Sequence, residues 1–405
     1  MKADLNLTFY REEKFKETPI GKIPEDWEVV KLEKICEKIK AGGTPLTYKK
    51  EFWNGKIPFV KIEDITSAGK YLTKTSTFIS EDGLENSNAW IVPQNSLLLA
   101  MYGSLGEVSI NKIPVATNQA ILGIIPLNKE DVEFLYYWYL YFKPNWKKYA
   151  KPTTQANLTA HIIKNSILPL PSLSERKLIA HILSTVDEAI QKTNEIIAKT
   201  ERLKKGLMQE LLTKGIGHKE FKDTEIGRIP KEWEVVRLGA VLSLKNGKRP
   251  KVTKGGNIPI YGANGVMGYT TEFLVDNDFT IVIGRVGASG EVHLGWGKIW
   301  VSDNAIYSKS YSRHRVYLPF IYRLLKLKNL SRFATKTTHP IITQTFLNTF
   351  PIQLPPLSEQ QQIASILSAV DKKLEVERKR KEKLEQIKKA LMDLLLTGKI
   401  RVKVN

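Results

Sequence analysis

The stretch Thr18-Pro-Ile-Gly-Lys-Ile-Pro-Glu-Asp-Trp-Glu-Val-Val-Lys-Leu32 returns later in the chain as Thr224-Glu-Ile-Gly-Arg-Ile-Pro-Lys-Glu-Trp-Glu-Val-Val-Arg-Leu238. A second phrase, Leu170-Pro-Ser-Leu-Ser-Glu175, returns as Leu354-Pro-Pro-Leu-Ser-Glu359. The second phrase recurs at a smaller offset than the first, so the segment between the two phrases is shorter in the second copy. A duplicated frame with varied contents predicts two equivalent halves related by a pseudo-two-fold axis, and it places the choice of partner in the contents.

A long amphipathic helix is expected after each closing phrase. Residues 174–213 and 358–396 carry apolar side chains at spacings of three and four, which form one narrow stripe on an otherwise polar helix. We expect Ser172 or Ser174 to cap the first helix and Ser358 to cap the second. Each helix of about 40 residues spans about 60 Å. A stripe this narrow needs one partner, and the other helix is the obvious one.

The connection between the helices predicts their relative direction. Residues 213–233 provide about 20 residues, and an extended chain reaches about 3.4 Å per residue. This reach is too short to bring the chain comfortably back along a rod of about 60 Å while some residues fold. We therefore predict that the helices pack as an antiparallel coiled coil, which needs no such return.

The segments outside the helices have the composition of compact mixed domains. Residues 27–168 and 233–352 are rich in Gly, Pro, Asn and aromatic residues, and each contains one short helix candidate, Val132–Phe142 and Pro319–Leu327. Short β-type runs occur at 57–62, 96–100, 279–283 and 298–301. The predicted fold class is α+β, with two α+β domains joined by the two long helices. The predicted boundaries are an N-terminal domain at 1–168, a first long helix at 169–215, a C-terminal domain at 216–352, and a second long helix with the C-terminal tail at 353–405.

Composition favours a polyanionic partner. The chain of 405 residues carries a formal net charge of +20 and a sequence pI of about 9.6. Such a balance favours nucleic acid first and an anionic membrane surface second, while the plain alternative is a basic chain from a lysine-rich proteome. Cys36 is the single cysteine, so an internal disulfide and a cysteine-built metal site are excluded. The charged first 20 residues do not resemble a signal peptide, and no apolar run approaches the roughly 18 residues of a membrane span, so we expect a cytoplasmic protein.

The doubled frame carries a family resemblance. The pattern Ile-Gly-x-Ile-Pro-x-x-Trp-x-Val-Val-x-Leu, followed by Leu-Pro-x-x-Ser-Glu and a long helix, occurs in both copies and resembles the specificity subunit of type I restriction-modification enzymes. Gly43-Thr-Pro45 with Trp53-Asn-Gly-Lys-Ile-Pro58 resembles the opening of one type of target recognition domain. Asn257-Ile-Pro-Ile-Tyr-Gly-Ala-Asn-Gly265 resembles the opening of another. Gly103-Ser-Leu-Gly-Glu-Val108 pairs with Gly287-Ala-Ser-Gly-Glu-Val292.

The resemblance implies a DNA-reading subunit that is not itself an enzyme. Such a subunit binds double-stranded DNA and joins two modification subunits, which bring S-adenosylmethionine and methylate adenine. Two restriction subunits join some complexes and cleave DNA with ATP and Mg2+. No cofactor is expected in this chain. Each recognition domain reads one half of a bipartite asymmetric target, while the helices set the spacer and dock the modification subunits.

The residues themselves also argue against an intrinsic active site. The sequence contains no Gly-x-x-x-x-Gly-Lys-Ser/Thr phosphate loop and no Asn-Pro-Pro-Tyr methyltransferase box. Gly295-Trp-Gly297 lacks the third glycine of a dinucleotide fingerprint, and the histidines show no His-x-x-x-His spacing. We therefore expect no catalytic and no metal-binding residues.

Candidate DNA-binding residues follow from residue type and from position in loops. Base reading needs planar donors and acceptors, and phosphate binding needs Lys, Arg, small hydroxyls or bare backbone. In the first domain the candidates are Thr44, Tyr48, Lys49, Lys50, Lys56, Gly103, Ser104, Lys147, Lys148, Lys151, Thr153, Thr154 and Gln155. In the second domain they are Lys245, Lys248, Arg249, Lys251, Arg285, Arg313, Arg315, Lys336, Thr337, Thr338 and His339. The plain alternative for each lysine is a solvated surface charge.

Two features of the sequence and the function itself allow more than one interpretation. Trp27 and Trp233 belong to the repeated frame, so we interpret them as core or helix-docking residues rather than as base-stacking residues. The basic face of residues 372–389 is either a solvated helix surface or a contact to the DNA backbone. The first rival function is a stand-alone bivalent DNA-binding protein of regulatory or architectural type. The second is a hydrolase or nuclease with an unrecognised site.

Overall fold

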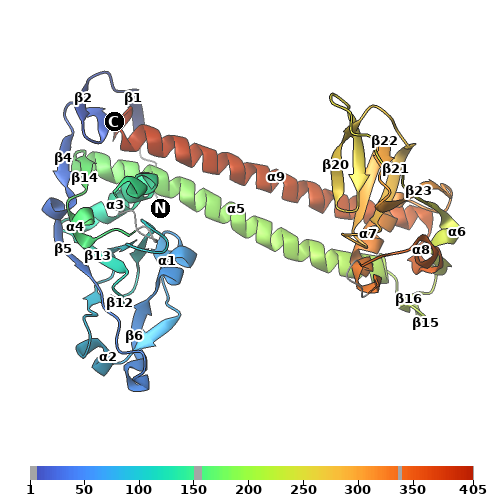
Figure 1. Cartoon of the computed structure of the whole chain (residues 1–405), viewed down its shortest axis with the longest axis horizontal. Helices are drawn as coiled ribbons and strands as arrows, with labels where there is room; N and C mark the ends of the chain where they lie inside the picture. Colours follow the sequence, from blue (N-terminus) through green and yellow to red (C-terminus); the bar gives the residue numbers. More distant parts are fainter. Residues whose placement is uncertain (1–6, 150–156, 336–339, 405) are drawn as a thin grey trace. The chain divides into compact units, whose positions relative to one another are not determined.

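The computed structural model describes residues 7–149, 157–335 and 340–404. The chain divides into two compact units. Unit 1 comprises residues 1–192 and 381–405, and unit 2 comprises residues 193–380. Two long helices, α5 (Leu173–Lys214) and α9 (Leu357–Leu396), are divided between the units, so each helix has one part in unit 1 and one part in unit 2 (Figure 1). Their observed bounds lie within one residue of the predicted ranges.

The repeated phrases form the same small strand frame in both units. In unit 1, β2 (Phe15–Thr18) and β3 (Gly21–Pro24) form a hairpin, and β4 (Glu28–Lys31) pairs with β14 (Ile167–Leu170). In unit 2, the corresponding strands are β15 (Phe221–Thr224), β16 (Gly227–Pro230), β17 (Glu234–Arg237) and β24 (Pro351–Leu354). The registers are also the same, because Glu28 faces Leu170 and Glu234 faces Leu354.

A tryptophan of each frame contacts the start of a long helix. The indole N–H of Trp27 donates to Glu175 Oε2 at 3.1 Å, and that of Trp233 donates to Glu359 Oε2 at 2.9 Å. Both tryptophans are fully buried. The interpretation of these residues as core and helix-docking residues is therefore confirmed. We call this hydrogen bond the tryptophan contact.

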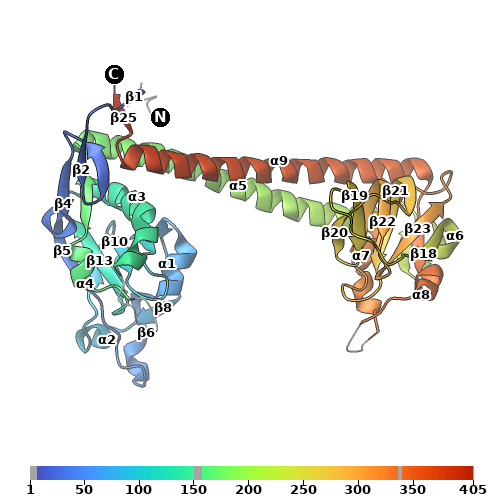
Figure 2. The same cartoon turned by 45° about the horizontal axis from the view of Figure 1, so that its top comes forward.

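The rest of unit 1 consists of two sheets and a buried helix. The larger sheet has the order β5-β13-β10-β11-β7, and the smaller has the order β8-β6-β12-β9. Helix α3 (Val132–Phe142) lies against the larger sheet (Figure 2), and its aromatic residues join the main core together with residues of α5 and α9. The strands are β5 (Cys36–Ala41), β6 (Trp53–Val60), β7 (Tyr71–Leu72), β8 (Thr77–Ile79), β9 (Ile91–Val92), β10 (Leu97–Ala100), β11 (Val108–Asn111), β12 (Val115–Thr117) and β13 (Ile121–Pro126). Short helices are α1 (Ile62–Ala68), α2 (Glu81–Glu85) and α4 (Ala160–Lys164).

Unit 2 contains one six-stranded sheet with the order β18-β23-β21-β22-β19-β20. Helix α7 (Leu318–Lys328) packs on β21 and β22 and shares a core with residues of α5 and α9. The strands are β18 (Leu242–Asn246), β19 (Ile258–Gly262), β20 (Gly265–Thr270), β21 (Val275–Gly284), β22 (Val292–Val301) and β23 (Ala305–Tyr311). Short helices are α6 (Leu238–Val241) and α8 (Gln344–Thr349). Both units are thus α+β, as predicted, and each predicted short helix is present with nearly the predicted bounds.

The long helices run antiparallel within each unit, as predicted. In unit 1 the amino-terminal part of α5 lies beside the carboxyl-terminal part of α9, with Asp187 Oδ1 2.7 Å from Lys388 Nζ. In unit 2 the reverse parts meet, with Asp371 Oδ1 2.6 Å from Lys204 Nζ. These two ion pairs join equivalent residues, because Asp371 follows Asp187 and Lys388 follows Lys204 at the same offset in the duplication.

One predicted helix cap is present and another is wrong. Ser172 Oγ accepts a hydrogen bond from the backbone N–H of Glu175 at 3.3 Å, which caps α5. Ser358, however, lies inside the first turn of α9, which begins at Leu357. The position equivalent to Ser172 is Pro356, which has no hydroxyl, and its backbone carbonyl accepts the N–H groups of Glu359 and Gln360 at 3.0 Å. The second helix therefore begins without the expected serine cap.

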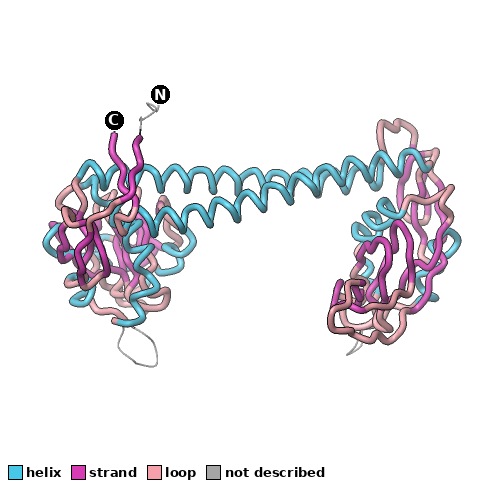
Figure 3. The backbone as a smooth tube through the Cα atoms, turned by 90° about the horizontal axis from the view of Figure 1, so that it is seen from above, coloured by secondary structure: helices cyan, strands magenta, loops and turns pink. Residues whose placement is uncertain are grey.

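The carboxyl-terminal tail, for which the sequence predicted no structure, forms strand β25 (Ile400–Val404). It pairs antiparallel with β1 (Leu7–Arg11), so the first and last described strands lie side by side (Figure 3). Arg401 on β25 reaches Glu175 with Nε at 2.6 Å and Nη2 at 2.8 Å. Its guanidinium also donates to Glu12 at 2.7 Å and to Asp26 at 2.9 Å. Burial disfavours the charge, but these carboxylates raise the pKa of Arg401 above its ordinary value.

We predict that Arg401→Met destabilises unit 1 by about 3 kcal/mol, because Glu175 would lose its cationic partner while remaining buried. The measurement is urea unfolding followed by tryptophan fluorescence. Lys403→Met is the matched control on the same strand, where the side chain is exposed and the expected change is within about 0.5 kcal/mol. Equal unfolding midpoints for the two variants would contradict the structural role of Arg401.

Candidate nucleic-acid interface

Backbone hydrogen bonds fix the loop after the first sheet strand in the same way in both units. In unit 1, Gly42 N donates to Ile121 O at 3.3 Å and Gly43 N donates to Thr117 O at 3.0 Å. In unit 2, Gly247 N donates to Ala305 O and Lys248 N donates to Val301 O, both at 2.9 Å. The loops that begin at Thr44 and Arg249 therefore leave equivalent ends of their sheets.

A glycine turn lies at this same sheet end in each unit. Gly106 N donates to Ala100 O at 2.8 Å, and Gly290 N donates to Gly284 O at 2.9 Å. The first glycines of the turns, Gly103 and Gly287, are exposed and have φ values of +70° and +85°, which favour glycine. The pairing of the two glycine motifs that the sequence indicated is therefore confirmed at the level of backbone geometry. Exposed backbone without a Cβ can approach a phosphate closely.

A third segment reaches this end of each sheet. Leu158 N donates to Met101 O at 2.9 Å, and Ile342 N donates to Arg285 O at 3.0 Å. Eight predicted contact residues come shortly before these two positions in the sequence and lie outside the described residues. They are Lys151, Thr153, Thr154, Gln155, Lys336, Thr337, Thr338 and His339.

Two loops of unit 1 bring Thr44 together with residues that the sequence did not single out. Thr44 Oγ1 lies 2.5 Å from Gln119 Oε1, and the hydroxyl of Tyr102 donates to the Gln119 backbone carbonyl at 2.8 Å. Asn157 lines a cavity of about 510 Å³ together with Tyr102 and Gln119. The cluster offers a hydroxyl, a phenol and two carboxamides, which are the groups that read base edges.

The other unit 1 candidates lie on the adjoining loop and on β6. Tyr48 is 76% exposed, and Lys50 and Lys56 are exposed. The ammonium of Lys49 lies 4.9 Å from the centre of the Phe52 ring. Ser104 lies near α1, with Thr66 Oγ1 donating to its hydroxyl at 3.5 Å. A large exposed aromatic beside lysines is a suitable surface for an unpaired or partly unstacked base.

In unit 2 the predicted loop residues Lys248, Arg249 and Lys251 are exposed. Arg285 is half-buried beside the glycine turn, and its guanidinium has no hydrogen bond or ion pair to the described part of the chain. Arginine with unoccupied donors suits a guanine edge or a phosphate. These four positively charged residues therefore lie on two neighbouring loops at this end of the sheet.

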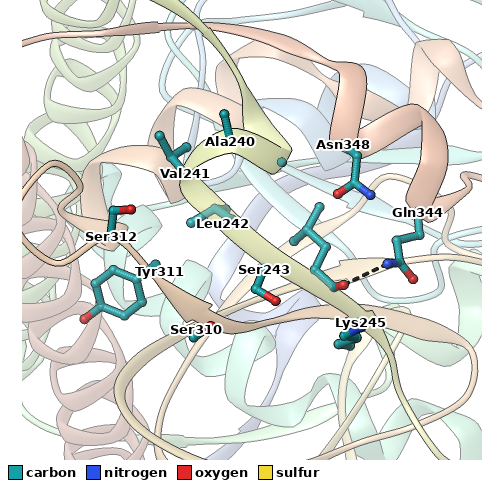
Figure 4. A pocket seen from close by; sticks show the side chains of 12 residues that line it. Ala240, Val241, Leu242, Ser243, Lys245, Ser310, Tyr311, Ser312, Gln344 and Asn348 are labelled. Atoms are coloured by element: carbon teal, nitrogen blue, oxygen red, sulfur yellow. Dashed lines mark hydrogen bonds between the residues drawn. The ribbon is translucent and has the colours of Figure 1, made fainter.

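Lys245 lies on a different feature, the outer edge of β18. It lines a cavity of about 710 Å³ between this strand and α8 (Figure 4). Gln344 and Asn348 extend from α8 towards the strand, and Gln344 Nε2 donates to the Leu244 carbonyl at 2.8 Å. Hydroxyl groups of Ser243, Ser310 and Ser312 also line the cavity. The lining is polar and suits contact with phosphate or sugar.

The structure separates Lys148, Arg313 and Arg315 from these loops. Lys148 lines a cavity with residues of the β2–β3 hairpin and the end of α9. Lys147 directly follows Trp146, whose ring lies beside Gly106 of the glycine turn. Arg313 and Arg315 follow Tyr311, whereas the Lys248 loop lies beside Ala305, at the other end of β23. Arg315 Nη2 donates to Glu234 of the frame at 2.7 Å. The basic clusters of the sequence contain these residues but do not indicate at which strand end they lie.

The length difference between the copies is concentrated beside this interface. Residues 44–100 in unit 1 and 249–284 in unit 2 lie between the same two equivalent backbone positions, and this segment accounts for nearly all of the difference. The shared backbone contacts therefore enclose the part that differs most. A short match between 118–121 (Asn-Gln-Ala-Ile) and 303–306 (Asp-Asn-Ala-Ile) was the signal that could have identified Gln119, and Tyr102 directly precedes the repeated glycine motif.

Across 7–149, 157–335 and 340–404, no group of three or more His, Cys, Asp or Glu side chains is arranged to hold a metal ion. Among the helices of the same residues, none combines the length and the apolar character needed to cross a bilayer.

The comparisons with known proteins agree with the duplicated architecture. The family model for the type I restriction modification DNA specificity domain matches this chain twice, at residues 24–202 and 230–386. The chain belongs to this family. The type I restriction enzyme MjaVIII specificity subunit of Methanocaldococcus jannaschii is 32% identical, with 98% of both chains covered. The MjaIX specificity subunit of the same organism is 30% identical, also with 98% of both chains covered.

Solved structures of specificity subunits share the fold. The S subunit of a type I restriction-modification system from M. genitalium matches with a TM-score of 0.61 at 18% identity, covering 92% of this chain and 96% of that one. A chain from a study of complex assembly and conformational transition in a type I system matches with a TM-score of 0.57 at 18% identity, covering 93% and 99%. The two-domain specificity-subunit fold is therefore shared despite low sequence identity.

For this specificity subunit, we predict that Arg285→Ala weakens DNA binding by the assembled complex by about 1–3 kcal/mol and relaxes base preference at one position of one half-site. The measurement is fluorescence anisotropy over single-base variants of the target duplex. Arg315→Ala is the matched control, because Arg315 bonds a surface carboxylate at the opposite strand end. The DNA affinity of a complex with this variant should stay within about twofold of wild type. Equal losses for the two variants would show that the loop end of the sheet is not the reading surface.

Proposed function

We propose that this chain is the DNA sequence-recognition subunit of a type I restriction-modification complex, and that each unit reads one half of a bipartite asymmetric target. One observation carries the proposal. Both units hold the same strand end with the same backbone contacts, but they place different loops there. Equivalent frames with different loops suit two different half-sites on one duplex.

The chemistry of methylation and cleavage is assigned to partner subunits. Two modification subunits would supply S-adenosylmethionine, and restriction subunits, where present, would use ATP with Mg2+. This chain would bind double-stranded DNA and contact those subunits along its helices without being catalytic. The non-catalytic assignment is supported by the sequence, which contains no phosphate loop and no methyltransferase box.

The proposal is tested by methylome sequencing of the source cell with and without this gene. We expect one bipartite methylation motif to disappear when the gene is deleted and to return on complementation. A regulatory or architectural DNA-binding protein would leave every methylation motif in place.

The purified chain alone should neither methylate nor cut DNA, and methylation that copurifies with the isolated chain would contradict its non-catalytic role.

The two long helices are proposed to set the spacer between the half-sites. Seven residues inserted after Lys192 in α5 and after Arg380 in α9 keep the 3.5-residue register and lengthen both helices by about 10 Å. That length corresponds to about three base pairs at 3.4 Å each. Three base pairs also turn one half-site relative to the other by nearly a third of a turn. We predict that the double insertion methylates the same two half-sites at a spacer enlarged by about three base pairs, or loses activity because the facing is not restored.

The measurement is methylation by the reconstituted complex over duplexes with graded spacer lengths. The control is the same insertion in α5 alone, which leaves the two helices unequal and should abolish activity. Full activity of the double insertion on the original spacer would show that the helices are not the ruler.

A further inference from the structure

Each long helix carries a second contact to its recognition domain, beyond the tryptophan contact. The sequences Leu183-Ser-Thr-Val-Asp187 on α5 and Leu367-Ser-Ala-Val-Asp371 on α9 are equivalent in the duplication. Asp187 Oδ2 accepts the hydroxyl of Tyr137 from α3 at 2.6 Å. Asp371 Oδ2 accepts Nη2 of Arg323 from α7 at 3.2 Å. We call these the aspartate contacts.

The other oxygen of each aspartate faces the second long helix. Asp187 Oδ1 lies 2.7 Å from Lys388 Nζ, and Asp371 Oδ1 lies 2.6 Å from Lys204 Nζ. One carboxylate therefore joins three elements in each unit, namely its own helix, the antiparallel helix and the helix of the recognition domain. The atoms have the same roles in both units, although the domain donors differ in chemistry.

The serine one turn earlier completes both contacts. Ser184 Oγ accepts Lys70 Nζ at 2.6 Å, and Lys70 also forms an ion pair with Glu133 of α3. Ser368 Oγ accepts Arg323 Nη2 at 2.8 Å. Lys70, Tyr137 and Arg323 are largely buried, and each donates a hydrogen bond to an acceptor on a long helix. Charge-assisted hydrogen bonds of this kind are strong and directional.

The spacing of the two contacts gives them a geometrical consequence. Glu175 and Asp187 have the same separation in sequence as Glu359 and Asp371, which places the two contacts about 18 Å apart along each helix. Apolar packing of α3 and α7 on the long helices also holds each domain, but apolar contacts are not directional. Directional hydrogen bonds at two separated points restrict the angle of a domain more than bonds at one point. The tryptophan contact and the aspartate contact are two such points in each unit.

We propose that Asp187 and Asp371 are positioning residues that fix the angle of each recognition domain on the long-helix pair, so that the assembled complex accepts a single spacer length. This inference rests on the proposed function, since it presumes a bipartite target. Neither residue contacts DNA in this mechanism. Their removal should broaden spacer tolerance while leaving the base preference within each half-site intact.

Unit 2 offers the sharper test. In unit 1, Tyr141 of α3 also donates to Asp393 of α9 at 3.0 Å, so a further contact survives the loss of Asp187. We therefore expect a larger effect from Asp371→Ala than from Asp187→Ala. The matched control is Glu201→Ala, which removes an ion pair between the long helices, to Arg378 at 2.6 Å, without touching the recognition domain.

The experiment measures kcat/KM for methylation by the reconstituted complex on duplexes with the native spacer and with one base pair more or fewer. One base pair changes the facing of the half-sites by about 34°. Asp371→Ala should reduce the preference for the native spacer by about tenfold, the size expected for the loss of a charge-assisted hydrogen bond. Glu201→Ala should retain the wild-type spacer preference. Discrimination against single-base changes within the half-sites should stay within about twofold of wild type for both variants.

Unfolding temperatures of all variants are measured in parallel. A variant that loses thermal stability but keeps the wild-type spacer preference would overturn the proposal, because the contact would then be structural only. Should Asp371→Ala not fold, Asp371→Ser decides: it keeps a polar side chain that is one atom shorter and loses the bond to Arg323, and an unchanged spacer preference in that variant would also overturn the proposal. A wild-type complex with no spacer preference at all would instead refute the proposed function.

Discussion

Both units depend on the hydrogen bonds of one carboxylate in the first turn of a long helix, which is buried at Glu175 and largely buried at Glu359. Glu175 and Glu359 accept the indole N–H of the frame tryptophan, and the helix amino terminus favours their negative charge. The remaining donors come from residues that follow the end of the other long helix. Arg401 fills this role in unit 1, and the Ile216 N–H and His218 Nε2, both at 2.9 Å from Glu359 Oε1, fill it in unit 2. Because a buried carboxylate without donors is costly, the frame, the start of one helix and the end of the other must meet.

This constraint explains how the contents of the two copies could diverge. The frame strands keep the same register, and backbone hydrogen bonds fix the same sheet end in each unit. Backbone contacts do not depend on side-chain identity, so the segment between them is free to change in length and sequence. Residues 44–100 form strands and two helices, whereas 249–284 form three strands and their connecting loops. Recognition loops can therefore change while their positions on the frame are kept.

The sequence predicted what is local and repeated. Helical periodicity located α5 and α9 within one residue, and the duplication identified Trp27 and Trp233 as frame residues. Strand pairing over long separations left no local signal, so the β1–β25 pair and the role of Arg401 were missed. The run at 57–62 was expected as one strand, but α1 begins at Ile62. Basic clusters gave the type of the site but not the strand end at which each cluster lies, so the separation of Arg313 and Arg315 from the Lys248 loop was not foreseen.

The placement of ion pairs distinguishes the two basic regions of the chain. Along α9, Arg378 pairs with Glu201, Lys381 with Glu385 and Lys388 with Asp187, so much of the helix charge is already neutralised by neighbouring carboxylates. Within the described residues, the side chains of Lys248, Arg249 and Lys251 form no such pair. A cation paired with a carboxylate must give up that partner before it can neutralise a phosphate. An unpaired cation can neutralise a phosphate directly, with release of a counterion from the DNA. Lys372, Lys373, Lys383 and Lys389 of α9 are exposed and likewise form no ion pair within the described residues. The basic face of α9 therefore mixes paired with unpaired cations, whereas the loop cations are unpaired, and a larger share of the loop charge is available to DNA.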